Sequence, residues 1–71
     1  MRTFKIAVFL ESSGLIDIVL EFLYKDKILK KILEINDKFE YPYVIIESTI
    51  NKKDLNKIFI KSKFRNYIKL E

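Results

Sequence analysis

The sequence has 71 residues and contains neither cysteine nor histidine, which is the feature that most restricts its fold. A chain of this length forms one domain at most, here residues 1–71, and buries only about 60% of its unfolded surface. Small domains usually gain stability from disulfides, a metal or a partner. Because disulfides and Cys/His zinc sites are excluded, unusually good packing or a partner has to stabilise this one.

The composition is that of a folded protein, with 49% hydrophobic and 34% charged residues. The net charge of +4 is compatible with contact to nucleic acid or to an acidic protein surface. The apolar run near the N-terminus is short, broken by Lys5, and lacks a small-residue cleavage site. No run approaches the roughly 18 residues that span a membrane. We therefore expect a cytoplasmic protein with no membrane contact.

The first 24 residues predict a strand followed by a helix. Apolar residues alternate through the strand at Phe4, Ile6, Val8 and Leu10. Ser12-Ser13-Gly14 ends it, and either serine could cap a helix from about Ser13 to Tyr24. An unpaired edge as apolar as this strand would invite aggregation, and pairing across a dimer would remove that edge.

The middle of the chain leaves two interpretations open. Residues 28–35 fit a helix by one spacing of their apolar residues and a strand by another. Asn36-Asp37-Lys38 predicts a turn, and Phe39 to Thr49 predicts a strand because it is rich in Tyr, Val and Ile. Pro42 belongs at the start or the edge of that strand, since it has no N–H to donate.

The last segment predicts a helix that Asn51 caps. One apolar face contains Leu55, Ile58 and Phe59, and a second, roughly opposite face contains Ile60, Phe64 and Tyr67. A helix with two apolar faces is buried on two sides, and so small a chain has little left to cover the second. The alternative is a shorter helix packed within the chain. The predicted partner-binding residues are Phe4, Ile6, Val8, Leu10, Ile60, Phe64 and Tyr67.

The order of elements predicts an α+β fold with both helices on one face of a small antiparallel sheet. No group of residues predicts catalysis. Gly14 is the only glycine, the carboxylates are scattered, and Ser12 and Ser13 have no base to activate them. We expect no enzymatic activity, no cofactor and no metal.

Two features could serve nucleic-acid binding. Four cations recur every four residues along one face of the predicted last helix: Lys53, Lys57, Lys61 and Arg65. Like charges at this spacing repel, so a sequence that keeps them could use them on phosphates, although a solvated Lys-rich face is the simpler interpretation. The exposed tyrosines Tyr41, Tyr43 and Tyr67 could stack on bases, although half-buried packing is the more frequent role.

Several segments resemble the small dimerising subunit family of the KEOPS tRNA-modification complex. The last strand of that family is similar to Val44-Ile45-Ile46-Glu47-Ser48-Thr49. Its final helix carries an Asn-Ser pair and then Leu-Arg, where this chain has Lys61-Ser62-Lys63-Phe64-Arg65. Upstream, Phe4 to Leu10, Ser12-Ser13 and a helix ending in Phe22-Leu23-Tyr24 fit the family's first strand and helix.

The resemblance implies a β-α-β-β-α fold with a three-stranded sheet, in which residues 28–35 form a strand. It also implies a non-catalytic subunit that pairs through its sheet and docks on the subunit that transfers a threonylcarbamoyl group to tRNA. Lys61 in place of Asn, and a bulkier first helix, suggest a divergent second small subunit that heterodimerises with the ordinary one. The alternatives are an independent RNA- or DNA-binding module and a homodimeric structural protein.

Overall fold

The computed structural model describes residues 2–38 and 40–71 as seven elements around one apolar core. Strand β1 covers Phe4–Leu10, a 3-10 turn covers Ser13–Leu15, and helix α1 covers Ile16–Lys25. Strands β2 and β3 cover Leu29–Asn36 and Tyr43–Ser48. Helix α2 covers Lys52–Ile60, and strand β4 covers Ile68–Leu70. The predicted α+β class is confirmed, but the sheet has four strands where three were expected.

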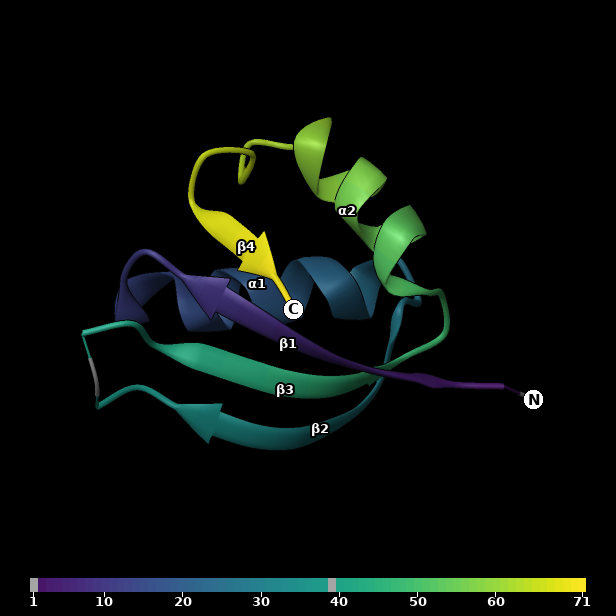
Figure 1. Ribbon diagram of the computed structural model, residues 1–71, viewed down its shortest axis with the longest axis horizontal. Helices are drawn as coiled ribbons and strands as arrows, with labels where there is room; N and C mark the ends of the chain where they lie inside the picture. Colours follow the sequence, from purple (N-terminus) through teal and green to yellow (C-terminus); the bar gives the residue numbers. More distant parts are fainter. Residues whose placement is uncertain (1, 39) are drawn as a thin grey trace.

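The sheet is antiparallel throughout, in the order β2-β3-β1-β4. This order gives two split β-α-β units, the ferredoxin-like arrangement, because β1 and β2 are parallel with β3 between them. Figure 1 looks onto the sheet, with α1 behind it and α2 beside β4. This arrangement supports many unrelated functions, so it indicates none by itself.

The core lies on one face of the sheet. Along β1 and β3 the even-numbered side chains are buried, as period-two alternation requires. They form one cluster with buried side chains of both helices, among them Val19 and Leu23 of α1 and Leu55 and Phe59 of α2. Ser48 is the buried polar exception, and its hydroxyl donates to the carbonyl oxygen of Ile50 at 2.7 Å.

Residues 28–35, which local spacing left undecided, belong to strand β2 from Leu29 on, and this agrees with the strand interpretation. Helix α1 stops before them because Lys27 adopts a left-handed conformation with φ 59°. The amide of Ile28 then bonds the carbonyl of Leu23, and that of Lys27 bonds the carbonyl of Tyr24. These two bonds are the pair expected at a Schellman helix end.

The hairpin between β2 and β3 begins at an Asn-centred turn, as the sequence predicts. The side-chain oxygen of Asn36 accepts a hydrogen bond from the amide of Lys38 at 3.1 Å. The predicted strand start at Phe39 lies outside the described residues, and the strand itself begins at Tyr43. Pro42 immediately precedes it, which agrees with the expectation that proline stands at the strand start.

The helix caps were predicted with mixed success. Asn51 caps α2, because its side-chain oxygen accepts from the amide of Asp54 at 2.8 Å. The serine cap of the first helix is wrong: neither the 3-10 turn, whose N-cap is Ser12, nor α1, whose N-cap is Leu15, has a side-chain cap bond.

The predicted long last helix is wrong beyond Ile60. The Ser62 hydroxyl donates to the carbonyl oxygen of Phe59 at 2.7 Å and accepts from the amide of Phe64 at 3.1 Å. A serine that bonds the backbone in this way replaces the next helical turn with a reverse turn. The chain then returns through residues 61–67 and adds Ile68–Leu70 to the free side of β1 as β4.

The early helix end carries Phe64 back into the core, where it is 2% exposed. Its ring lies 5.4 Å from that of Phe22 and 6.3 Å from that of Phe59, both edge to face, measured between centroids. The Phe22 and Phe59 rings are 5.8 Å apart. This three-ring cluster joins α1, α2 and the segment before β4, so it holds both helices to the last strand.

We therefore expect Phe64→Ala to lower the free energy of unfolding by about 3–5 kcal/mol, because it empties a packed aromatic site. Ile60→Ala is the matched control, since Ile60 ends α2 with half of its surface exposed and should change stability by at most about 1 kcal/mol. Urea denaturation followed by circular dichroism measures both. Equal losses in the two variants would contradict this end of α2.

Candidate functional site

The face of the sheet opposite the core carries an aromatic pair near one end of its two middle strands. Phe9 of β1 and Tyr43 of β3 are directly opposite across the strands, with ring centroids 5.6 Å apart. The Tyr43 hydroxyl donates to a carboxylate oxygen of Glu34 on β2 at 2.6 Å, which fixes the ring. Both aromatic residues are partly exposed, so this end of the outer face is apolar and the described residues leave it uncovered.

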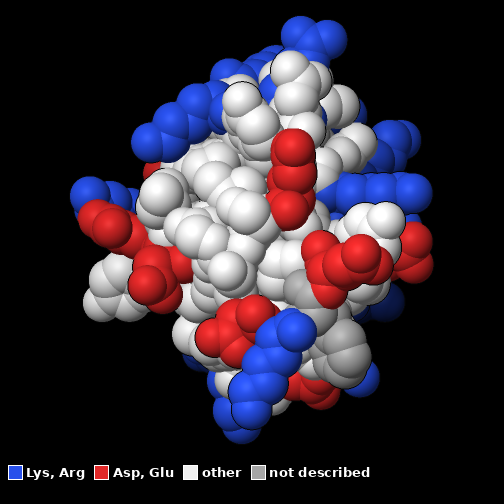
Figure 2. Space-filling view, turned by 90° about the vertical axis from the view of Figure 1, so that its left-hand side faces the viewer, with Lys and Arg blue, Asp and Glu red and all other residues white. Residues whose placement is uncertain are grey.

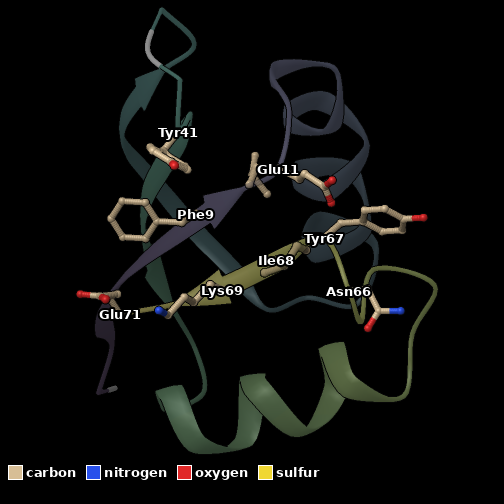
Figure 3. Close-up of a pocket in the computed structure, with 9 residues that line it drawn as sticks. Phe9, Glu11, Tyr41, Asn66, Tyr67, Ile68, Lys69 and Glu71 are labelled. Atoms are coloured by element: carbon tan, nitrogen blue, oxygen red, sulfur yellow. The ribbon is translucent and has the colours of Figure 1, made fainter.

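A hollow of about 600 Å³ opens beside this pair, over the junction of β1 and β4. Backbone hydrogen bonds also join the two strands beyond both ends of the β1–β4 ladder. The amide of Glu11 donates to the carbonyl of Tyr67, and Ala7 and Glu71 each donate one hydrogen bond to the other. Figure 3 shows Phe9 and Tyr41 on one side of the hollow and Tyr67 on the other. The lining residues are Phe9, Leu10, Glu11, Tyr41, Asn66, Tyr67, Ile68, Lys69 and Glu71.

The rim of the hollow carries charge of both signs. Glu11 and Glu71 contribute carboxylates and Lys69 an ammonium group. Figure 2 looks at this end of the molecule and shows an uncharged surface bordered by carboxylates, with most lysines and arginines further out. The lining is therefore slightly acidic, in contrast to the net positive charge of the chain.

A second uncovered surface is strand β2, an edge strand that, in the described part of the chain, pairs only with β3. Three large apolar side chains are exposed on it, Ile32 at 41%, Leu33 at 40% and Ile35 at 49%. The register with β3 shifts twice, between Leu29 and Lys31 and between Ile32 and Glu34. Such shifts twist an edge and restrict which strands can pair with it.

The predicted basic stripe is present but not as one helix face. Lys53 and Lys57 lie on α2, Lys61 is its C-cap residue, and Arg65 lies in the turn after the helix. All four are exposed. They belong to a basic segment, residues 52–65, that holds six Lys or Arg and one Asp, a net charge of +5. In the described part of the chain the only ion pair joins Lys25 to Glu21, so these cations have no acidic partner.

The prediction that the whole of Phe4–Leu10 offers a free edge is wrong, because β4 pairs with the second half of this strand. β1 lies inside the sheet, with β3 along one side and β4 beside Val8–Leu10 on the other. Its side chains Ile6, Val8 and Leu10 are buried in the core, as is Phe64. The partly apolar second face of this strand favours a central or covered position, but the sequence does not reveal β4, which has only three residues and lies where helical spacing continues. Of the predicted partner-binding residues, Ile60 and Tyr67 are exposed and Phe4 is partly exposed.

Sequence reasoning identified Tyr41, Tyr43 and Tyr67 as exposed aromatics but not the hollow that two of them line. It did not identify Phe9 as a surface residue, because the partly apolar second face of β1 suggested a central or covered position. The signal was nevertheless present: positions 5, 7 and 9 form the second face of β1, and Phe9 is the aromatic residue on it.

Among residues 2–38 and 40–71, no cluster of Asp and Glu could hold a metal ion. Within the same residues, no helix is long and apolar enough to cross a membrane. Comparison with protein families, curated proteins and solved structures finds no match to this chain. Its function is therefore argued from the two uncovered surfaces and the basic segment.

If Tyr41 and Tyr67 serve to bind a partner and do not stabilise the fold, replacing them should leave the fold intact. We expect Tyr41→Ser, at a residue 73% exposed, to change the free energy of unfolding by less than about 0.5 kcal/mol. Tyr67→Ser, at a half-exposed residue, should stay below about 1 kcal/mol. Tyr43→Ser should cost more than either, because it removes the contact with Phe9. Thermal unfolding of the three variants ranks them, and a loss at Tyr41 equal to that at Tyr43 would show a structural role.

Proposed function

We propose that this chain is a non-catalytic accessory subunit that pairs with a related small subunit and supports a KEOPS-like assembly making threonylcarbamoyl adenosine in tRNA. The observation that carries the pairing is the exposed apolar edge of β2. The assignment to tRNA modification is supported by the resemblance of Val44–Thr49 and of the Ser62, Phe64 and Arg65 segment to that family.

The edge that pairs is β2 and not β1. Along β2 the backbone groups that point away from β3 have no strand beside them, over eight residues. Adding a strand there satisfies those groups and covers Ile32 and Ile35, which otherwise remain half in water.

A related small subunit suits this edge better than an arbitrary strand. The two register shifts and the exposed Lys30 and Lys31 are features that keep an edge from pairing indiscriminately. A partner therefore needs a matching twist and acidic residues opposite the lysines. A homologous β2 edge provides the twist, and a heterodimer allows the charges to differ between the two chains.

Size-exclusion chromatography with light scattering tests the pairing, first on the protein alone and then mixed with the ordinary small KEOPS subunit of the same organism. We expect the wild-type protein to form a one-to-one heterodimer with that subunit. The double variant Ile32→Lys, Ile35→Lys should stay unpaired. Ile18→Lys is the matched control, since Ile18 is an equally exposed isoleucine on α1. A wild-type protein that ignores the added subunit would overturn the proposal.

A second candidate function is binding of RNA or DNA through the basic segment. The specific observation is its charge of +5, with no ion pair to a carboxylate among residues 2–38 and 40–71, whereas the remaining residues of the chain have eight cations and nine carboxylates. Cations on α2 and in the turn after it could neutralise phosphates regardless of base sequence.

This candidate predicts salt-sensitive binding. Fluorescence anisotropy with labelled tRNA should show an affinity that falls between 50 and 200 mM salt by about 10²-fold or more, if about four phosphates are neutralised. A variant with four changes to Gln should lose most of that dependence: Lys53, Lys57, Lys61 and Arg65. A charge-matched control changes four exposed lysines elsewhere: Lys5, Lys25, Lys30 and Lys38. Equal loss in both variants would indicate a net-charge effect without a site.

A further inference from the structure

The outer face of the sheet is a surface of its own, distinct from the β2 edge and from the basic segment. Its middle is formed by three side chains of β1 and three of β3: Lys5, Ala7, Phe9, Tyr43, Ile45 and Glu47. Lys5 is exposed and the other five are partly exposed. In Figure 1 this face is turned toward the viewer, because α1 lies behind the sheet, and no helix lies in front of β1 and β3.

We infer that this face binds a second copy of the same chain, face to face, about a twofold axis that runs along the strands between β1 and β3.

The six side chains stand in three rows across the two strands, and the two members of each row complement each other. The rows consist of a cation and a carboxylate, a small and a large apolar side chain, and two aromatic rings: Lys5 and Glu47, Ala7 and Ile45, Phe9 and Tyr43. A twofold axis between β1 and β3 lays β1 of one copy over β3 of the other, and each row over the same row. Every side chain therefore meets the side chain that complements it.

The middle row gives the closest match. Packed sheets cross at about 30°, so facing rows diverge toward the ends of the strands. At the middle row the small side chain of Ala7 leaves room for Ile45 of the second copy, and the reverse contact is identical. Large side chains that face small ones allow two layers to interdigitate.

The charged row supports pairing with an identical face. Within residues 2–38 and 40–71, neither Lys5 nor Glu47 takes part in an ion pair, although the two are directly opposite in the sheet. In the face-to-face arrangement Lys5 of each copy lies over Glu47 of the other, so the same attraction occurs twice. The second sheet also displaces water from these charges, which strengthens the attraction.

The charge of the whole face argues against nucleic acid as its occupant. The register places three lysines and three glutamates on it, so their charges cancel: Lys5, Lys31, Lys69, Glu34, Glu47 and Glu71. A base stacked on Tyr43 would also bring its phosphate near the carboxylate of Glu34, which lies 2.6 Å from the Tyr43 hydroxyl. A face with equal numbers of opposite charges instead suits a copy of itself.

The size of the face predicts a weak dimer. Strands spaced by about 4.8 Å and rising about 3.3 Å per residue give the four strands a common face of roughly 400 Å². Two such faces bury roughly 800 Å² before the relief of the side chains is added, which lies at the low end of specific interfaces. We therefore expect the dimer to form and dissociate reversibly as the protein concentration changes.

The first experiment records NMR spectra of the ¹⁵N-labelled full chain from micromolar to millimolar concentration. The amide resonances of β1 and β3 should move as the concentration rises. Those of α1 should stay in place, since α1 lies behind the sheet. Sedimentation equilibrium gives the dissociation constant.

Charge reversal tests the facing rows. Lys5→Glu places carboxylates opposite each other across the interface, and Glu47→Lys places ammonium groups there, so each variant alone should raise the dissociation constant at least about tenfold. A mixture of the two variants restores opposite charges in both contacts. It should form a one-to-one heterodimer with about the wild-type dissociation constant. A role within one chain would give no such rescue, because each variant keeps its like charges side by side.

The ion pair on α1 provides matched controls. Lys25→Glu and Glu21→Lys make the same changes of charge at an opposite-charge pair behind the sheet. Both should self-associate as the wild type does. Circular dichroism checks that all four variants are folded.

Four outcomes would overturn the inference. Wild-type resonances that stay constant up to millimolar concentration would exclude self-association, and failure of the two variants to pair would exclude the facing rows. Concentration-dependent shifts confined to β2 would assign self-association to that edge. Shifts of Phe9 and Tyr43 caused by a short single-stranded RNA, without self-association, would assign the face to base stacking. Because the β2 edge is unchanged in every variant, heterodimer formation with the small KEOPS subunit tests the proposed function independently.

Discussion

The structure depends on one apolar layer between a four-stranded sheet and two short helices. A chain of 71 residues has only enough apolar side chains for one such layer, so the opposite face of the sheet has no cover of its own. The uncovered Phe9–Tyr43 pair and the hollow beside it follow from this limit, as does the bare edge of β2. In a larger domain, further elements would cover these surfaces.

Local sequence pattern was enough to predict the helices and strands whose apolar residues keep one regular spacing along their length. β1, α1, β3 and the start of α2 follow from alternation, helical spacing and the Asn51 cap. The α+β class follows from their order. The strand at residues 28–35 did not follow from local pattern, because its two register shifts break the alternation that would have distinguished it from a helix.

The end of α2 and the formation of β4 depend on tertiary contacts that spacing does not encode. Phe64 lies at a position that suits a helix, yet its ring gains more by meeting Phe22 and Phe59 in the core. Only the Ser62 side chain signals the turn locally, through its bonds to the backbone. The candidate sites were affected in the same way: the exposed tyrosines and the cations could be predicted one by one, but not the hollow that β4 creates.

The position of β1 also has a consequence for how the chain folds. Phe4 pairs with Ser48 and Val8 pairs with Leu70, 44 and 62 residues further along the sequence. Both neighbours of the central strand β1 come much later in the sequence than β1 does. Each pairing therefore closes a long loop, and the entropy lost in closing it is compensated only after the strands have met. This high contact order predicts slow folding for so small a domain. During synthesis the backbone groups of β1 that bond to β4 stay unpaired until residues 68–71 have left the ribosome.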